Sequence, residues 1–460
     1  MTREWVRLAL NDPDGLNSLF LNAARHLSVS HPQQQQQERY AELAVRYKVL
    51  CVRAVSQAIG SSGTGVGSFS DTVFAETLAL AFDELLLGDQ VMIKRHVQGA
   101  VHMVESNGGW HTLGLNGFLE ILLLRGSVVL VTGATGFVAG HVIKAFLDRG
   151  FKVRGTVRDL DKASWLVKDL LKTYAAKGDL ELVAVPDFAD EHAFDEAVKG
   201  VSAIAHVASI VTFDSDPNKV IPQTVLGTTS ILGSALKEPS VKEFVYTSSI
   251  VATAMPIPGI EANVTHDTFN DAAVKLAWSP SASGGVVYMA SKVEAEKAVW
   301  KFVEEKAPHF TVNVVNPAYI IGEPLHRSHA NSPGAWLKPL YDGNLEALSL
   351  SPAIYTVDVK DVAVLHAAAV IDPEVKNARL QAWADNTNWN GLLAILRKQW
   401  PDKKFIDDLP GLGTMSITTD FTQPLGLLKK WAGQEGWKPL EETVDDNIRG
   451  IVDLTEGDLL

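Results

Sequence analysis

Tyr288 and Lys292 form a Tyr-x-x-x-Lys pair, and of the eight tyrosines in the chain only Tyr288 has a lysine at that spacing. Residues four positions apart lie on one face of a helix. A cation beside a phenol stabilises the phenolate and lowers the phenol pKa from its usual value near 10. The spacing therefore predicts a proton-exchanging pair that works at neutral pH. The same spacing also occurs in helices where both side chains only face solvent.

A short segment upstream, residues 244–249, begins apolar and ends in the three hydroxyl residues Thr247, Ser248 and Ser249. A buried strand of this kind would present the hydroxyls at the carboxyl edge of a parallel sheet. There a hydroxyl can donate to a substrate oxygen as negative charge develops on it. A Ser/Thr turn or a helix cap is the alternative for any single one of them. Their occurrence together with the Tyr/Lys pair favours catalysis.

The element that must position these groups begins at residue 128, where four apolar residues predict a buried strand. Gly133 and Gly136 follow and allow a tight turn with close approach of a ligand to the backbone. An apolar helical pattern then runs to a stop at 148–150, and Ala139 takes the third position of the glycine fingerprint. A strand, a glycine turn and a helix N-terminus form a pyrophosphate site, so a dinucleotide-binding βαβ unit is predicted.

Strand and helix patterns alternate after residue 126. Further strands are predicted over 151–157, 180–185, 204–207, 244–247 and 312–315, with helices between them, for example over 191–199 and 291–305. The layout predicts an α/β fold with a Rossmann-type doubly wound parallel sheet. We expect the core mainly over 126–325 and a smaller C-terminal substrate lobe mainly over 326–460.

Residues 1–125 form an appended, mostly helical segment in this interpretation, with helices expected over 39–58 and 70–87 and a flexible loop over 60–67. The stretch 84–124 resembles a piece of the helical regulatory region of fungal zinc-cluster transcription factors. Those factors bind DNA through a six-cysteine cluster. Cys51 is the only cysteine here, so DNA binding is not implied, and the function of this segment stays unknown.

Composition narrows the class of protein. The net charge of −13 argues against nucleic acid as a partner, because such a partner requires a basic face. One cysteine excludes a disulfide framework and a Cys-based metal site, and no metal is expected. The longest apolar stretch, 118–131, is too short and too charged to cross a membrane. No secretory signal opens the chain, so a cytoplasmic protein is expected.

Residues 126–455 resemble an extended short-chain dehydrogenase/reductase, and within that family the NADPH-dependent aldehyde and ketone reductases of fungi and yeasts, which are related to plant dihydroflavonol reductases. The matching motifs occur in family order and cover most of about 330 residues. They lie at 131–139, 153–158, 187–188, 205–209, 247–249, 288–292 and 316–322.

The resemblance implies three catalytic residues. Ser249 orients and polarises the carbonyl oxygen, Tyr288 donates the proton, and Lys292 lowers the tyrosine pKa and holds the nicotinamide ribose. Ser248 takes the role of Ser249 if the register at the strand end differs by one. His206 is interpreted as a packed strand histidine, because the Tyr/Lys pair already supplies the acid–base group.

The resemblance also implies an NADPH site. Arg158 closes the second strand, where an acidic residue would bind the 2′-hydroxyl of NAD, and a guanidinium suits a 2′-phosphate. Lys162 can assist, whereas Asp159 is a competing signal for NAD. The cofactor is expected on Gly133, Thr135, Gly136, Phe137, Val138, Arg158, Lys162, Asp187, Phe188, Ala208, Ser209, Tyr288, Lys292, Pro317 and Tyr319.

The predicted function is reduction of a small-molecule aldehyde or ketone to an alcohol. Phe213 and Trp336 are expected to line an apolar substrate pocket. The alternatives are other chemistry of the extended family, namely a hydroxysteroid dehydrogenase or a nucleotide-sugar epimerase or dehydratase, and a non-catalytic regulator that senses NADPH. Arg327 is the only arginine between Arg158 and Arg379, which disfavours a sugar-nucleotide lobe. The sequence leaves monomer and dimer open.

Overall fold

The computed structural model describes residues 15–31, 33–61, 71–87, 89, 91–92, 95–96, 98–100, 103, 127–331, 337–344 and 351–456. Contacts between Cα atoms divide the chain into two compact units, of which the larger comprises Gly126–Val370 and Val375–Leu460 and the smaller Met1–Arg125 with Ile371–Glu374. Each unit is described by itself.

The larger unit is built on a seven-stranded sheet in which every neighbouring pair is parallel. The order across the sheet is β10-β7-β5-β4-β1-β2-β3. The strands are β1 (Val128–Val131), β2 (Lys152–Val157), β3 (Leu180–Ala184), β4 (Ala203–His206), β5 (Glu243–Thr247), β7 (Thr311–Pro317) and β10 (Arg379–Ala382). The order reverses between β1 and β4, and ligands of doubly wound sheets bind at the carboxyl ends beside such a switch point.

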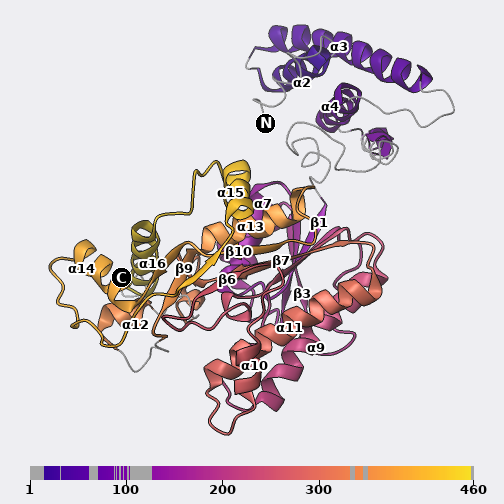
Figure 1. Cartoon of the computed structure of the whole chain (residues 1–460). Coiled ribbons are helices and arrows are strands. Elements are labelled where there is room, and N and C mark those ends of the chain that lie inside the picture. Colours follow the sequence, from indigo (N-terminus) through magenta and orange to yellow (C-terminus); the bar gives the residue numbers. More distant parts are fainter. Residues whose placement is uncertain are drawn as a thin grey trace. The chain divides into compact units, whose positions relative to one another are not determined.

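Helices cover both faces of this sheet (Figure 1). One face carries α9 (Pro217–Lys237) and α11 (Gly284–Lys306), and the other carries α7 (Phe137–Asp148) and α13 (Val359–Ile371). A strand covered on both sides is apolar on both sides, which explains the continuous run of Val and Leu in β1. The core between the sheet and the α9–α11 layer includes Ile204, Phe244 and Val312, all fully buried.

A smaller lobe forms around the three-stranded sheet β11-β9-β8. Its core joins Leu340, Trp389, Leu393 and Ile448. The lobe and the connecting segments contain β8 (Tyr319–Ile321), η4 (Arg327–Asn331), α12 (Leu337–Asp342), β9 (Ile354–Asp358), β11 (Asp385–Thr387), α14 (Trp389–Gln399), β12 (Ile417–Thr419), α15 (Thr422–Ala432) and α16 (Leu440–Glu456). The remaining elements of this unit are η2 (Leu166–Leu170), α8 (Lys172–Ala176), η3 (Ile250–Ala252), β6 (Ala262–Val264) and α10 (Asp271–Ala277).

The predicted Rossmann-type fold is confirmed, and two of its elements differ from expectation. The seventh strand, β10, comes from the region assigned to the substrate lobe, where a four-residue strand starting with Arg379 has no clear alternating pattern. Residues 191–199 were predicted helical but form turns. Asp190 accepts from the His192 N–H and Ser234 holds Asp195, and such local side-chain bonds favour turns over a short helix.

The smaller unit is helical, as predicted. It contains α2 (Gly15–Ser30), α3 (Gln34–Ser61) and α4 (Asp71–Leu87), which pack around a core that includes Cys51. Arg25 donates to Asp83 at 2.6 Å in the interior of this unit. Most of the predicted loop over 60–67 and of the stretch 84–124 lies outside the described residues. Within the described part of the chain, no helix has the length and apolar character that a membrane span requires.

Candidate active site

The carboxyl end of β5 and the middle of α11 bring the three predicted catalytic residues to one place. Lys292 is buried, and its Nζ donates to the Thr247 carbonyl at 2.9 Å and to Ser209 Oγ at 3.4 Å. The same Nζ lies 5.2 Å from the centre of the Tyr246 ring. The lysine therefore joins the ends of β4 and β5 to the helix that carries the tyrosine.

Tyr288 lies one helical turn before Lys292 and is half-buried. Burial raises the pKa of Tyr288 to about 12, and hydrogen bonding with Ser249 offsets part of the rise. The sequence predicted the opposite direction, with Lys292 lowering this pKa. That prediction is wrong for the chain alone, because the lysine ammonium bonds to Thr247 and Ser209 and burial of the phenol dominates.

The lysine is itself perturbed. Burial lowers the pKa of Lys292 to about 8, and the nearby carboxylate of Glu296 raises it in part. The direction follows from the cost of keeping an ammonium away from water. At neutral pH Lys292 is therefore mostly a cation and Tyr288 is a neutral phenol.

The two candidate serines have different surroundings. Ser248 is buried and its Oγ donates to Glu296 Oε2 at 2.5 Å. Ser249 is half-buried, and its Oγ accepts a long 3.4 Å bond from the Val251 N–H at the start of η3. Ser249 is also the serine whose hydroxyl reaches Tyr288. The register of the motif thus agrees with Ser249 as the substrate-facing group.

The glycine turn has the geometry that its residues predict. Gly133 has φ +69°, and a Cβ on it would lie 3.2 Å from the Cβ of Ala208. Gly136 is the N-cap of α7 and provides no side-chain oxygen to the first turn. The first N–H groups of a helix have no partners within the helix, so this end can accept an anion.

The hydroxyl of Thr132, to which the sequence analysis assigned no role, connects the carboxyl ends of β1 and β4 at the switch point. Thr132 Oγ1 accepts from the N–H groups of Val207 and Ala208 at 3.0 and 2.9 Å and pairs with His206 Nδ1 at 2.9 Å. Burial lowers the pKa of His206 to about 3, so the ring is neutral. Having accepted two bonds, Thr132 donates its own proton to His206 Nδ1. This supports the interpretation of His206 as a packed strand histidine.

The end of β2 distinguishes between the two competing cofactor signals. Arg158 is exposed, and among the described residues no hydrogen bond or ion pair engages its guanidinium. Asp159 instead accepts from the N–H groups of Asp161 and Lys162 at 3.0 and 3.1 Å, and these bonds lower its pKa. The Lys162 ammonium lies 3.7 Å from the same carboxylate. Asp159 therefore caps its own turn, while Arg158 remains available to a ligand.

The predicted adenine-side pair lies after β3. Asp187 is exposed and accepts from the Ala189 N–H at 3.0 Å, whereas the Phe188 ring packs against the main core. A Cβ on Gly227 of α9 would lie 2.2 Å from that ring. Gly227 therefore creates the space in which Phe188 sits.

Two predicted cofactor residues direct their side chains into protein cores. The Phe137 ring is buried and lies 5.7 Å from His141 and 5.9 Å from His329. The Tyr319 ring packs 5.8 Å from Trp389 in the small lobe. Any contact of these two with a cofactor would therefore come mainly from their backbones. Pro317, at the end of β7, is buried, and the exposed Thr135 and half-buried Val138 flank the helix start.

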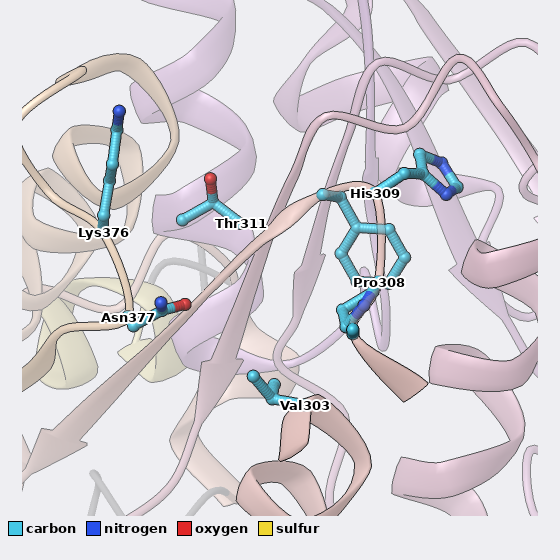
Figure 2. Close-up of a pocket in the computed structure, with 8 residues that line it drawn as sticks. Val303, Pro308, His309, Thr311, Lys376 and Asn377 are labelled. Atoms are coloured by element: carbon cyan, nitrogen blue, oxygen red, sulfur yellow. The ribbon is translucent and has the colours of Figure 1, made fainter. Parts of the chain in front are cut away.

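The predicted pocket residues are only partly placed. Phe213 is 46% exposed and its ring lies 5.7 Å from that of Tyr288, while Trp336 falls outside the described residues. A cavity of about 400 Å³ lies at the opposite edge of the sheet, where β7 begins (Figure 2). It contains none of the predicted site residues; its lining is Val303, Ala307, Pro308, His309, Phe310, Thr311, Lys376 and Asn377.

A parallel sheet with a glycine turn at its switch point, and with a Ser/Tyr/Lys group at the same edge, defines a nicotinamide-dependent oxidoreductase of Rossmann type. Residues 130–381 match the model of the 3-beta hydroxysteroid dehydrogenase/isomerase family. The chain is 38% identical over 336 residues to aldehyde reductase 2 of Sporidiobolus salmonicolor, covering 71% of this chain and 96% of that protein. It is 36% identical over 332 residues to a ketoreductase of Penicillium rubens, with 70% and 96% covered.

Among solved structures, the chain is similar to yeast methylglyoxal/isovaleraldehyde reductase in complex with NADPH. The TM-score is 0.60 at 26% identity, covering 72% of this chain and 99% of that one. The protein therefore belongs to the extended short-chain dehydrogenase/reductase family, and the predicted family and enzyme class are confirmed. The comparisons give no support to the resemblance between 84–124 and a zinc-cluster regulatory region.

Proposed function

We propose that this protein uses NADPH to reduce an aldehyde or ketone to an alcohol, with Tyr288 as the proton donor. The observation that carries the proposal is the convergence of Ser249, Tyr288 and Lys292 at the sheet edge that also presents the glycine turn. The aldehyde reductase, the ketoreductase and the NADPH-bound reductase to which the chain is similar support the same chemistry.

The residues present fit a phosphorylated dinucleotide. The space beside Gly133 would be filled by any Cβ, and the start of α7 has no side-chain cap. The guanidinium of Arg158, which has no bond to any other described residue, suits a 2′-phosphate, because charge-assisted bonds to phosphate are among the strong ones. In this proposal Lys292 would hold a ribose hydroxyl, and Gly133, Gly136 and the N–H groups of α7 would hold the pyrophosphate.

Bound NADPH supplies the hydride. The chain supplies the proton and the orientation of the carbonyl. Because its pKa lies at about 12, Tyr288 keeps its proton throughout the neutral range, as a donor in reduction requires. Ser249 donates toward the carbonyl oxygen and so stabilises the charge that develops there. Phe213 beside Tyr288 provides an apolar surface for the substrate side chain.

Two other functions compete with this proposal. A hydroxysteroid dehydrogenase would use the same three residues on a polycyclic alcohol, and the matching family model is named for that activity. A non-catalytic regulator would bind NADPH without turnover. We favour the carbonyl reductase because a sensor has no need for all three catalytic groups, and because the reductases named above match nearly along their full length.

The remaining assignments belong to the same proposal. We place the enzyme in the cytoplasm, acting on a small molecule and not on nucleic acid. We also propose that residues 126–460 form the reductase domain and that residues 1–125 are an appended helical unit.

The test is turnover of the full-length protein with NADPH and a panel of aromatic aldehydes, β-keto esters and 3-oxosteroids. Turnover is measured as the loss of NADPH absorbance. Turnover with the first two classes and little with the steroids is expected. Preferred turnover of steroids would favour the hydroxysteroid alternative. NADPH binding without turnover of any carbonyl would favour the regulator.

A further inference from the structure

Glu296 is a fully buried carboxylate one helical turn beyond Lys292 on α11. Its Oε2 accepts from Ser248 Oγ at 2.5 Å and from Asn316 Nδ2 at 2.8 Å. Its Oε1 accepts from Arg379 Nε at 2.5 Å and from Trp300 Nε1 at 3.3 Å. All four groups donate to the side chain of Glu296. Because only an ionised carboxylate accepts freely on both of its oxygens, the four bonds together require the ionised acid.

Arg379, the partner charge, is itself held in place. Both side chains of the Glu296–Arg379 pair are fully buried. The Arg379 Nη1 donates to the carbonyls of His266 and Thr268 at 2.9 and 2.6 Å, and the guanidinium lies 4.4 Å from the centre of the Phe269 ring. The positions of both side chains in this ion pair are therefore fixed by the bonds that surround them.

The carboxylate connects this ion pair to the catalytic groups. Asn316, at the end of β7, donates both to Glu296 and to the Ser249 carbonyl, the second bond at 3.2 Å. Ser248, bound to the other lone pairs of the same oxygen, precedes Ser249 in the chain. Oε2 of Glu296 thus binds Ser248 directly after β5 and Asn316 at the end of β7, and both of these residues are attached to Ser249.

We propose that Glu296 is a positioning residue of the reductase, which fixes Ser249 through Ser248 and Asn316 and provides the counter-charge for the buried Lys292. The inference rests on the proposed function. It assigns no contact with substrate or cofactor to Glu296, whose fully buried carboxylate is bonded to four protein groups.

The electrostatic surroundings of Lys292 agree with this role. Besides the Thr247 carbonyl and the Ser209 hydroxyl, it lies near the Tyr246 ring on β5 and the neutral His206 on β4. Glu296 is the group that opposes the effect of burial on the lysine pKa. Removal of its charge would lower the pKa of Lys292 further and leave less of the cation at neutral pH.

The test is Glu296→Gln beside Glu294→Gln, which removes the same charge from a half-buried position two residues earlier on α11. A glutamine accepts on one side only, so two of the four bonds are lost. We expect kcat to fall about ten- to hundredfold, as for a small misplacement of reacting groups, with KM for the carbonyl changed by less than about threefold. The alkaline fall of kcat/KM should move to lower pH by about one unit. Glu294→Gln should match the wild type.

An unchanged pH profile and kcat in a folded Glu296→Gln protein would overturn the proposal. If the single variant does not fold, Glu296→Gln combined with Arg379→Gln removes both buried charges together, and the same kinetic comparison applies to it. The pKa of Lys292 measured by NMR on ¹³C-labelled lysine gives a readout that needs no turnover. A lysine pKa unchanged in the variant sinks the inference, whereas lack of carbonyl turnover by the wild type sinks the proposed function alone.

Discussion

The hydroxyl of Ser248 donates a 2.5 Å hydrogen bond to Glu296 Oε2, and this bond distinguishes the two adjacent serines at the end of β5. A buried hydroxyl whose proton is held by a carboxylate cannot also donate to a substrate. Ser249 is half-buried, accepts a long bond from the Val251 N–H and reaches the Tyr288 hydroxyl, so no carboxylate holds its proton. A neighbour 48 positions along the chain therefore favours Ser249 over Ser248 as the serine that faces the substrate.

The two serines should differ sharply when mutated. Ser249→Ala removes a donor to the developing oxyanion and should lower kcat by about 10²–10³. Ser248→Ala removes one of four bonds to Glu296 and should lower kcat by less than about tenfold. Steady-state kinetics of both variants with the same aldehyde provides the comparison. The reverse order of effects would show that Ser248 faces the substrate.

Tyr288→Phe should leave folding and NADPH binding intact while turnover falls about 10²–10⁴, the usual contribution of a general acid. The ring, with its contact to Phe213, is retained, and only the proton is lost. Tyr355→Phe is the matched control, since its hydroxyl donates to the Ile417 carbonyl in the small lobe. Near wild-type turnover of the Tyr288→Phe protein would exclude Tyr288 as the donor.

Arg158→Ala should weaken NADPH binding about ten- to hundredfold and NADH binding much less. The estimate corresponds to a charge-assisted bond worth about 1.5–3 kcal/mol. Asp159→Asn serves as the control, because this carboxylate caps its own turn and should affect both cofactors alike. Fluorescence titration of both cofactors against the three proteins measures the effect. Equal losses for both cofactors in Arg158→Ala would make Arg158 a structural residue.

Local pattern was enough to predict six of the seven strands of the sheet, the glycine turn and the Tyr/Lys helix, because each depends on residues a few positions apart. Thr132, Glu296 and Asn316 escaped prediction because their partners are separated from them by 20–83 positions in the sequence. The direction of the Tyr288 pKa was missed for a similar reason. Spacing places Lys292 on the same helix face, but only the fold shows that the ammonium turns to the Thr247 carbonyl.

Acid should destabilise the fold through four buried histidines. Burial lowers the pKa of His206 to about 3 and those of His141, His329 and His366 to about 4, from the ordinary histidine value of 6.5. A depressed folded pKa gives a stability contribution that is present above 6.5 and is lost as pH falls toward the folded value. Each ring should contribute a slope of about 1.4 kcal/mol per pH unit in that window.

Urea unfolding between pH 7.5 and 5 measures this dependence. His206→Gln places a side chain there that is neutral at every pH, so the free energy of unfolding should depend less on pH, by the contribution of one histidine. Substitution of the exposed His192 should leave this pH dependence unchanged. A slope in the His206→Gln protein equal to that of the wild type would show that this ring is not protonated on unfolding in the expected window.

Residues 1–125 should be dispensable for chemistry. Every residue placed in the proposed mechanism lies beyond residue 127, and the family model matches only from residue 130. The larger compact unit starts at Gly126, so the strand β1 and the glycine turn need no residue from the first quarter to complete the sheet. Domains of this size usually fold independently and are joined at Gly-containing boundaries.

A protein that begins near Leu124 should therefore fold, bind NADPH and reduce carbonyls at rates close to those of the full chain. Thermal unfolding and turnover of the shortened and full-length proteins, measured side by side, decide the matter. An unfolded or inactive shortened protein would mean that the first quarter belongs to the reductase core, and the proposed boundary at residue 126 would be wrong.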